Sequence, residues 1–220
     1  MLNTNDIQNS KQMRFKIILI LFIALSINIF AQDNQNLTFN DGIFISFNDF
    51  KQNQSIAFSQ IISNKPIEND IKEFLKKKKI NYFDNNGIQQ ELKTKNIWGY
   101  CYNNKIYIHY NNEYNIIPII GSISHFIANK QVYTQAYSDP FQSPYSYNDT
   151  YKTSEPQEYI LDINSGAVYE FNIKNFLLLL SKDNDLYTEF IKLKKRQQRQ
   201  MIYIYLRRFN EKHRITLPNN

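Results

Sequence analysis

The sequence predicts an α+β domain in which an antiparallel sheet of about six to eight strands, open or curled toward a barrel, is followed by C-terminal helices. Three observations indicate this class. Short apolar and aromatic runs alternate with turn residues from 80 to 128, a polar stretch from 130 to 158 interrupts them, and apolar residues recur at helical spacing after 172. With 220 residues the chain has room for one such domain.

The first 31 residues have the layout of an export signal. Three basic residues within 11–16 precede an apolar run, 17–30, which ends at Ala31 before a polar stretch. This run is shorter than the roughly 20 residues that a membrane-spanning helix needs. We therefore expect cleavage after Ala31, with an uncleaved anchor or a buried core helix as the alternatives. The mature domain, residues 32–220, is expected to work in the periplasm, in the envelope or as a secreted protein, without an acyl anchor or a transmembrane span.

Composition and charge narrow the function classes. Residues 32–220 contain 23 Lys and Arg against 19 Asp and Glu, a mild excess that does not by itself indicate a nucleic-acid binder. Cys101 is the only cysteine, so no intramolecular disulfide can form even in an oxidising compartment. Stability must come from packing, for which aromatic residues, 15% of the chain, supply large apolar surfaces.

The N-terminal half predicts a first strand, a weak second strand and a short helix. Apolar residues alternate from Ile43 to Phe47, whereas the alternation in 56–62 is poor. Pro66 suits a first helical turn, and apolar residues follow it at helical spacing, which predicts a helix over 66–77. The lysines at the end of that helix complement its dipole and need no ligand.

Paired runs around turn residues predict hairpins, because Asn and Gly tolerate positive φ. The predicted pairs are 80–83 with 88–92 around Asp84–Gly87, 97–102 with 105–110 around Asn103-Asn104, 114–120 with 122–128 around Gly121, and 158–163 with 167–171 around 164–166. Pro118 lacks an amide donor, which places its strand at an edge or interrupts it.

Residues 130–158 predict a long surface loop, because Pro140, Pro144 and Pro156 oppose regular pairing. Its aromatic rings offer stacking surfaces for sugars or partner chains, but a mobile or self-packed loop is the favoured explanation for them. These rings are Tyr133, Tyr137, Phe141, Tyr145, Tyr147 and Tyr151.

Residues 172–213 predict the C-terminal helical part. Asn172 can cap one helix, and Asp183 or Asp185 can cap a longer one that runs to about His213. Between Lys194 and Gln200 there are seven consecutive polar residues. The second helix must cross solvent there or break.

The first candidate nucleophile is Cys101, with His109 on the facing strand of the same predicted hairpin. A two-residue turn at Asn103-Asn104 pairs Cys101 with Ile106, which puts the thiol and the imidazole on opposite faces of the sheet. A three-residue loop would bring them to the same face. The alternative is that both residues have only structural roles, Cys101 as a buried core residue and His109 as a solvated or ring-stacked side chain.

No other constellation predicts catalysis, a metal or a cofactor. The histidines, which include His125 and His213, lack metal-ligand spacing, and the chain has no GxSxG, GxGxxG or Walker motif. Carboxylates such as Asp41, Asp49, Asp162 and Glu170 are expected to be solvated acids at strand ends. We therefore expect neither a metal nor a cofactor.

One helical surface is a candidate for binding. On a continuous second helix, five basic residues would lie within about 120° of arc, opposite the apolar stripe. They are Lys192, Lys195, Arg196, Arg199 and Arg207. Such a face can meet anionic lipid, an acidic glycan or an envelope protein, and the bland alternative is an ordinary solvated helix face. Nucleic acid is not expected as a partner of an exported chain.

Several segments resemble a group of small uncharacterised exported proteins of Bacteroidota. The segments are 41–50 (DGIFISFNDF), 97–108 (IWGYCYNNKIYI), 120–128 (IGSISHFIA), 159–171 (YILDINSGAVYEF) and the basic C-terminal helix. The run that ends in Phe30-Ala31-Gln32 resembles signal peptides of that group. The resemblance implies export and a common fold, and it supplies no activity or site residues.

The sequence thus favours a non-enzymatic exported protein of the cell envelope or periplasm that binds a partner or a surface. The first alternative is a small carrier of apolar ligands, if the sheet closes around a cavity. The second is a hydrolase without a recognisable motif.

Overall fold

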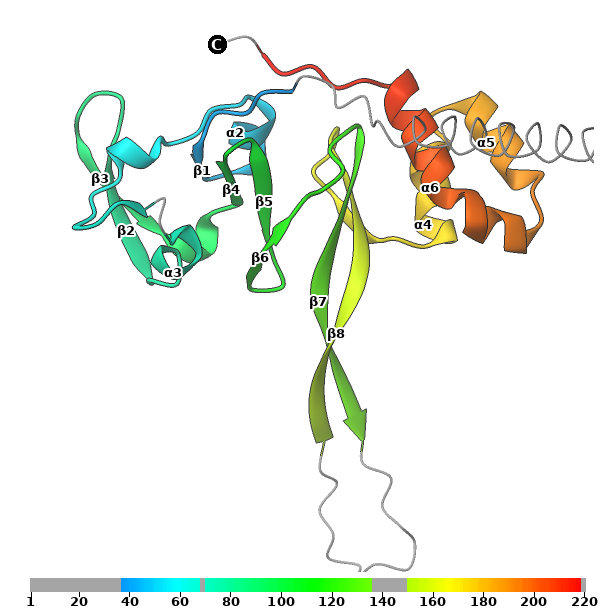
Figure 1. The fold of residues 1–220 in the computed structure, drawn as a ribbon, viewed down its shortest axis with the longest axis horizontal. Coiled ribbons are helices and arrows are strands. Elements are labelled where there is room, and N and C mark those ends of the chain that lie inside the picture. The colour runs from blue at the N-terminus through cyan, green and yellow to red at the C-terminus, as the bar shows by residue number, and fades with distance from the viewer. Residues whose placement is uncertain (1–36, 68–69, 136–149, 219–220) are drawn as a thin grey trace, which may run out of the picture. The chain divides into compact units, whose positions relative to one another are not determined.

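The computed structural model describes residues 37–67, 70–135 and 150–218, so the predicted export signal, 1–31, lies outside the described residues. Residues Thr38–Asn220 form one compact unit. In the described residues, nine antiparallel strands form three sheets, and three helices follow the last strand (Figure 1). The predicted α+β class with C-terminal helices is confirmed. The described strands form three separate open sheets and no closed barrel.

The first sheet has the order β1-β4-β5-β6 and contains two tight hairpins. Asn103-Asn104 joins β4 (Gly99–Tyr102) to β5 (Lys105–Tyr110), and Asn111-Asn112 joins β5 to β6 (Glu113–Ile116). All four asparagines have positive φ, which a two-residue type I′ turn requires and Asn adopts at low cost. The first hairpin and its register were predicted, and the second turn was not. β6 is an edge strand that ends before Pro118, as expected.

β1 (Gly42–Phe44) is shorter than the predicted strand because a helix begins where the strand was expected to continue. Ser46 caps α2 (Phe47–Lys51): its hydroxyl accepts a hydrogen bond from the amide of Asp49 at 3.1 Å, and the carboxylate of Asp49 accepts one from the amide of Ser46 at 2.8 Å. This reciprocal capping box satisfies two helix-end donors locally and outweighs the strand-like alternation of the segment.

The second sheet is the predicted hairpin of β2 (Lys79–Phe83) and β3 (Gln89–Lys93). Gly87 has a φ of +74°, and the carboxylate of Asp84 accepts hydrogen bonds from the amides of Asn86 and Ile88, both at 2.9 Å. The turn is therefore held by its own residues, which explains why the sequence alone predicted it.

The remaining elements of this half are short. The weak second strand is reduced to single bridges at Ile56 and Ile61 around the 3₁₀ turn η2 (Phe58–Gln60). Within the described residues, the predicted helix over 66–77 is regular only as α3 (Ile71–Phe74), and η4 (Thr94–Asn96) precedes β4. Together with β2–β4, these segments enclose a core of buried Ile, Phe, Leu and Tyr side chains.

The third sheet, β7-β8-β9, corrects the predicted surface loop over 130–158. β7 (Ile123–Gln135) and β8 (Thr150–Asp162) pair along their full lengths, and β9 (Val168–Glu170) pairs only with the end of β8 (Figure 1). Pro156 lies inside β8 opposite Asn129. The carbonyl of Glu158 faces β9, where it accepts from the amide of Phe171 at 2.8 Å, so the amide-free nitrogen of Pro156, two residues earlier, faces the same outer side. Proline at this position therefore removes none of the backbone hydrogen bonds between β7 and β8. The tip of the predicted loop, 136–149, lies outside the described residues.

The C-terminal part consists of three helices, α4 (Ile173–Leu180), α5 (Asn184–Ile191) and α6 (Lys195–Lys212). Asn172 and Asp183 cap α4 and α5 as predicted, through bonds to backbone amides at 2.9 Å and 3.1 Å. The expected long helix is interrupted at residues 192–194, where the polar segment 194–200 begins, and the rest of that segment lies in α6. In the described residues, no helix combines the length and the apolar character that crossing a membrane requires.

Polar side chains at the start of α6 stabilise this break. The side-chain amide of Gln198 donates to the carbonyl of Phe190 at 3.0 Å, near the end of α5, and the side-chain oxygen of Gln197 accepts from the amide of Lys194 at 3.1 Å. Backbone groups that a continuous helix would satisfy are therefore satisfied by glutamines.

The three helices pack on the base of the third sheet. The core contains Ile123 of β7 and Ile160 of β8, and the rings of Phe176 on α4 and Phe190 on α5 meet edge to face at 5.5 Å between centroids. Fully burying each such ring contributes about 1.5–3 kcal/mol. This core fixes α5 and α6 side by side, which matters for the basic residues described below.

Candidate functional site

Cys101 and His109 do not form a catalytic pair. Cys101 is opposite Ile106, as the two-residue turn predicted, so the two side chains lie on opposite faces of the sheet. The Cys101 thiol is buried and lies 3.3 Å from a carboxylate oxygen of Asp41. Burial, followed by this carboxylate, raises the pKa of the thiol well above its usual range. His109 stacks on Tyr114 at 4.8 Å, and burial lowers the pKa of its imidazole.

Cys101 is therefore expected to react slowly with thiol reagents in the folded protein. The reactive species is the thiolate, which burial disfavours, and the core leaves a reagent no access to the sulfur. An aromatic disulfide reagent at neutral pH should label less than a tenth of the protein in the time that labels all of it in denaturant. Full labelling of the native protein at the denatured rate would contradict this placement.

A polar chain that the sequence did not reveal links β7, α6 and β8. The hydroxyl of Tyr203 donates to the carboxylate of Glu158 at 2.6 Å and lies 3.4 Å from Nε2 of His125. His125 is 5% exposed, its Nδ1 has no hydrogen-bond partner among the described residues, and burial lowers the pKa of the imidazole. These residues are 33 to 78 positions apart in the chain, so no local pattern marks them. The imidazole of His125 packs edge to face against the rings of Phe171 and Tyr203.

The candidate carboxylates are engaged separately, and Asp162 corrects the expectation that they are solvated. Its side chain is 6% exposed and accepts from Lys182 at 2.8 Å and Ser165 at 2.7 Å. Burial alone would raise the pKa of Asp162, but these hydrogen bonds outweigh it and the pKa is lowered. Asp49 caps α2, and Glu170 pairs with Lys130. In the described ranges, no cluster of three or more His, Cys, Asp or Glu side chains is placed to hold a metal ion.

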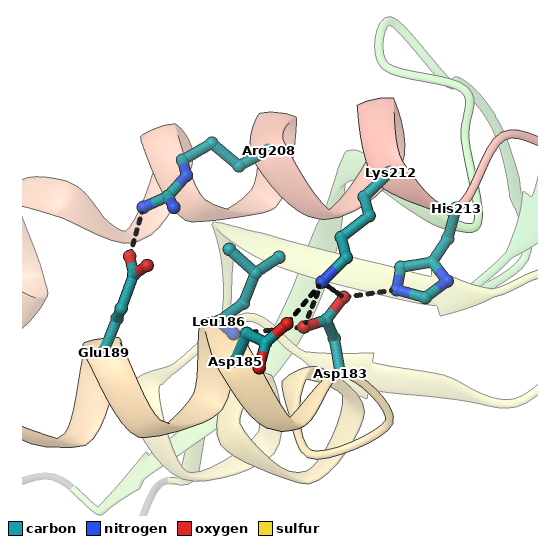
Figure 2. A network of polar contacts seen from close by, with 7 residues as sticks. All are labelled: Asp183, Asp185, Leu186, Glu189, Arg208, Lys212 and His213. Atoms are coloured by element: carbon teal, nitrogen blue, oxygen red, sulfur yellow. Dashed lines mark hydrogen bonds and ion pairs between the residues drawn. The ribbon is translucent and has the colours of Figure 1, made fainter.

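A second polar network fastens the start of α5 to the end of α6 (Figure 2). The buried carboxylate of Asp183 contacts the ammonium of Lys212 at 2.8 Å and Nε2 of His213 at 2.7 Å. Lys212 also reaches Asp185 at 3.1 Å. The hydrogen bond from Lys212, opposed by burial and assisted by the amide of Leu186 and by His213, lowers the pKa of Asp183 far below its usual range. Arg208 and Glu189 form a further pair at 2.7 Å, so the two helices run antiparallel.

The predicted basic surface exists only in part. Lys192 ends α5, and Lys195 and Arg199 lie on α6 in line with buried Ile202 and Leu206, because steps of three and four residues return to one helix face. They are exposed because this face of α6 is buried only from Ile202 onward. The expectation that all five residues lie opposite the apolar stripe is therefore wrong, since it assumed one continuous helix.

The break gathers most of the basic residues at one corner. We define the basic corner as Lys192, Lys194, Lys195, Arg196 and Arg199, which are all exposed. Arg207 does not belong to it, because it lies eight residues beyond Arg199, the nearest member, about 12 Å along the helix axis. Lys194 was not among the predicted residues, and it joins the corner because it lies in the connection between α5 and α6.

The basic corner holds the entire charge excess of residues 32–220. No Asp or Glu occurs between positions 192 and 200, and the remaining 18 Lys and Arg stand against 19 Asp and Glu. Among the ion pairs within the described residues, none involves a residue of the corner. The first turn of α6 contains no acid, so its cations oppose the helix dipole and destabilise the helix end slightly. Helix stability therefore does not explain them.

A surface depression of about 330 Å³ lies in the N-terminal half beside η2. It is open to solvent and lined by Phe58, Ile61, Ile67 and polar residues of 59–65. It is not enclosed by the sheet and has one aromatic side chain in its wall, which differs from the aromatic-lined cavity that a carrier of apolar ligands would need.

No protein-family model, curated protein or solved structure matches this chain.

Proposed function

We propose that the protein is a non-enzymatic, exported protein of the cell envelope that attaches to an anionic lipid surface through the basic corner. The observation that carries the proposal is the concentration of charge: the corner contains five cations, whereas the rest of residues 32–220 is almost neutral. Each Lys or Arg side chain that lies close to an anionic membrane surface contributes about 1 kcal/mol to binding.

The geometry of the corner suits a surface more than a single small ligand. Its cations are exposed along the connection from the end of α5 to the second turn of α6, and Ile191 beside them is 45% exposed. Long basic side chains around an exposed aliphatic side chain suit shallow contact with lipid headgroups. A discrete anion would require convergent donors in a concave site.

Binding to vesicles tests this proposal. Protein recovered after export should bind vesicles that contain phosphatidylglycerol and should not bind vesicles of phosphatidylcholine alone. The triple variant Lys195→Glu, Arg196→Glu, Arg199→Glu should lose at least about tenfold in affinity, because each position changes from attraction to repulsion. Raising the salt from about 0.1 M to 1 M, which shortens the Debye length from about 10 Å to 3 Å, should abolish binding.

A control variant with the same charge change separates the corner from total charge. Lys93, Lys95 and Lys105 are exposed lysines of the N-terminal half. Their replacement by Glu should change affinity less than about threefold. Equal losses in the two triple variants would show that only net charge matters. Failure of the wild-type protein to bind anionic vesicles, or a clear preference for an acidic glycan or a nucleic acid over vesicles, would overturn the proposal.

The export part has its own test. Edman sequencing or mass spectrometry of protein from the extracytoplasmic fraction should find a new N-terminus after Ala31. Full-length protein with Met1 in the cytosol would contradict the proposal, which assumes a membrane surface outside the cytoplasm.

A further inference from the structure

The outer edge of β7 changes character along its length. In an antiparallel strand, the N–H and C=O of one residue point to the same side, and alternate residues point to opposite sides. The amide of His125 donates away from β8, to the carbonyl of Ile119, at 2.9 Å. The outward-facing positions of β7 are therefore 125, 127, 129, 131, 133 and 135.

The first part of this edge is covered and the second part is not. His125 bonds to Ile119, and the carbonyl of Asn129 accepts from the side-chain amide of Asn111 at 2.8 Å. Among residues that the structure describes, no second strand pairs with the outer edge from Gln131 to Gln135. An unpaired row of backbone donors and acceptors is a template for another strand.

The two outer edges of the β7–β8 ribbon are protected differently. On β8, Pro156 removes an outward amide, and Lys152 and Glu155 place charges along the strand. Residues 131–135 of β7 are Gln-Val-Tyr-Thr-Gln, which contain no charge, proline or glycine. Lys130, the last charge before them, is neutralised by Glu170. The devices that usually prevent edge pairing are therefore present on β8 and missing on this stretch of β7.

We propose that a second copy of this chain pairs with β7 through residues 131–135, in antiparallel orientation around a two-fold axis at Tyr133. With this register, Tyr133 faces its own copy, and Gln131 faces Gln135 of the second copy. Each facing pair exchanges two backbone hydrogen bonds. A register centred on Gln131 would need the outer edge at Asn129, whose carbonyl Asn111 already occupies. The inference does not depend on the proposed membrane binding.

Self-pairing also fits the weakness of the isolated ribbon. Beyond Pro156 the described part of β8 has no partner other than β7, so the distal ribbon is two-stranded and exposed on both faces. Two-stranded ribbons are marginally stable in water, whereas a four-stranded sheet made by two copies satisfies both inner edges. An isologous contact of this kind closes as a dimer and leaves the protected β8 edges outside.

Sedimentation equilibrium of the exported protein tests the proposal, with Tyr133→Pro as the first variant. Position 133 faces outward, so proline removes an interface donor and leaves the bonds to β8 in place, as Pro156 does on the other strand. The wild-type protein should be a dimer, and the variant should dissociate at least about tenfold more readily. Gln131→Lys, which retains the backbone, should weaken the dimer as well because it places a charge on each copy's edge.

The matched control is Ser154→Pro, which makes the same backbone change at an outward-facing position of β8. The dissociation constant of its dimer should stay within about threefold of the wild-type value. Circular dichroism identifies a variant that fails to fold, in which case Gln131→Lys decides. The proposal is overturned if the wild-type protein stays monomeric up to about 1 mM. It is equally overturned if Ser154→Pro weakens the dimer as much as Tyr133→Pro does, or if neither variant affects it.

Discussion

Replacing Asn210 by Ala should lower the free energy of unfolding by about 3 kcal/mol, because it leaves two buried backbone groups without partners. The side-chain oxygen of Asn210 accepts from the amide of Ile123, and its amide donates to the carbonyl of Ile123, both at 2.9 Å. A helix side chain thus satisfies the first residue of β7. A Cβ on Gly121 would lie 2.4 Å from the Asn210 side chain, so no other residue type at 121 leaves room for this contact.

Chemical denaturation measures this effect, and Asn210→Asp refines it. Aspartate keeps the acceptor and loses the donor, so its carboxylate faces the Ile123 carbonyl and its pKa should rise in the folded state. A raised pKa gives stability that is present at low pH and lost as the pH rises. The deficit of Asn210→Asp relative to wild type should therefore shrink as the pH falls toward about 4 and stay constant below that value. Gln200→Ala, at an exposed position of the same helix, should change stability by less than about 0.5 kcal/mol.

Replacing Asp183 by Ala should cost about 2 kcal/mol, which combines a lost helix cap with a lost hydrogen-bonded ion pair. For a domain of this size the expected fall in Tm is about 4–8 °C. Asp183→Asn keeps a side-chain acceptor for the amide of Leu186 and loses only the charge, so about 1 kcal/mol should be lost. Lys212 is half-exposed, and the solvent screens much of its attraction to Asp183.

The pH dependence distinguishes the charge from the cap. Because the folded pKa of Asp183 is lowered, its contribution is fully present above the unfolded value near 3.9 and is lost as the pH falls toward the folded value. The difference between wild type and Asp183→Asn should therefore be constant from about pH 5 upward and shrink below about pH 4. Asp185→Asn, at a side chain that is 80% exposed, should cost less than about 0.5 kcal/mol. A difference that grows on acidification would contradict the assignment.

The hairpins β2–β3, β4–β5 and β8–β9 were predictable because each turn is determined by neighbours in the chain, whereas the β5–β6 turn was missed and the pair predicted around Gly121 is reduced to one bridge between Ile119 and His125. Asn103-Asn104 adopts positive φ at low cost, and this turn sets the register that separates Cys101 from His109. The caps at Asn172 and Asp183 were predictable for the same reason, since each side chain bonds to an amide three residues ahead. The capping box of Ser46 and Asp49 was equally local, but the strand alternation of the same residues concealed it.

The ends of the predicted loop, 130–135 and 150–158, were predicted wrongly because the effect of a proline in a strand depends on its position. Pro156 prevents pairing only on the side where its amide would donate, and that side depends on which neighbour β8 has there. β9 ends before it reaches Pro156, which is decided by the fold and not by nearby residues. The residues of the basic corner were predicted only in part for a similar reason, because the position where α5 ends decides which basic residues lie together.

The sequence by itself determined the α+β class, three of the hairpin turns, the caps at Asn172 and Asp183 and the presence of a basic segment near residue 195, because all of these follow from interactions within a few residues. Only the tertiary structure decided that Lys194 joins this segment while Arg207 does not, that His125 meets Tyr203 and Glu158, and that among the described residues no strand pairs with the outer edge of β7 from Gln131 to Gln135. These features arise from contacts between distant parts of the chain, whose geometry no local pattern of residues encodes.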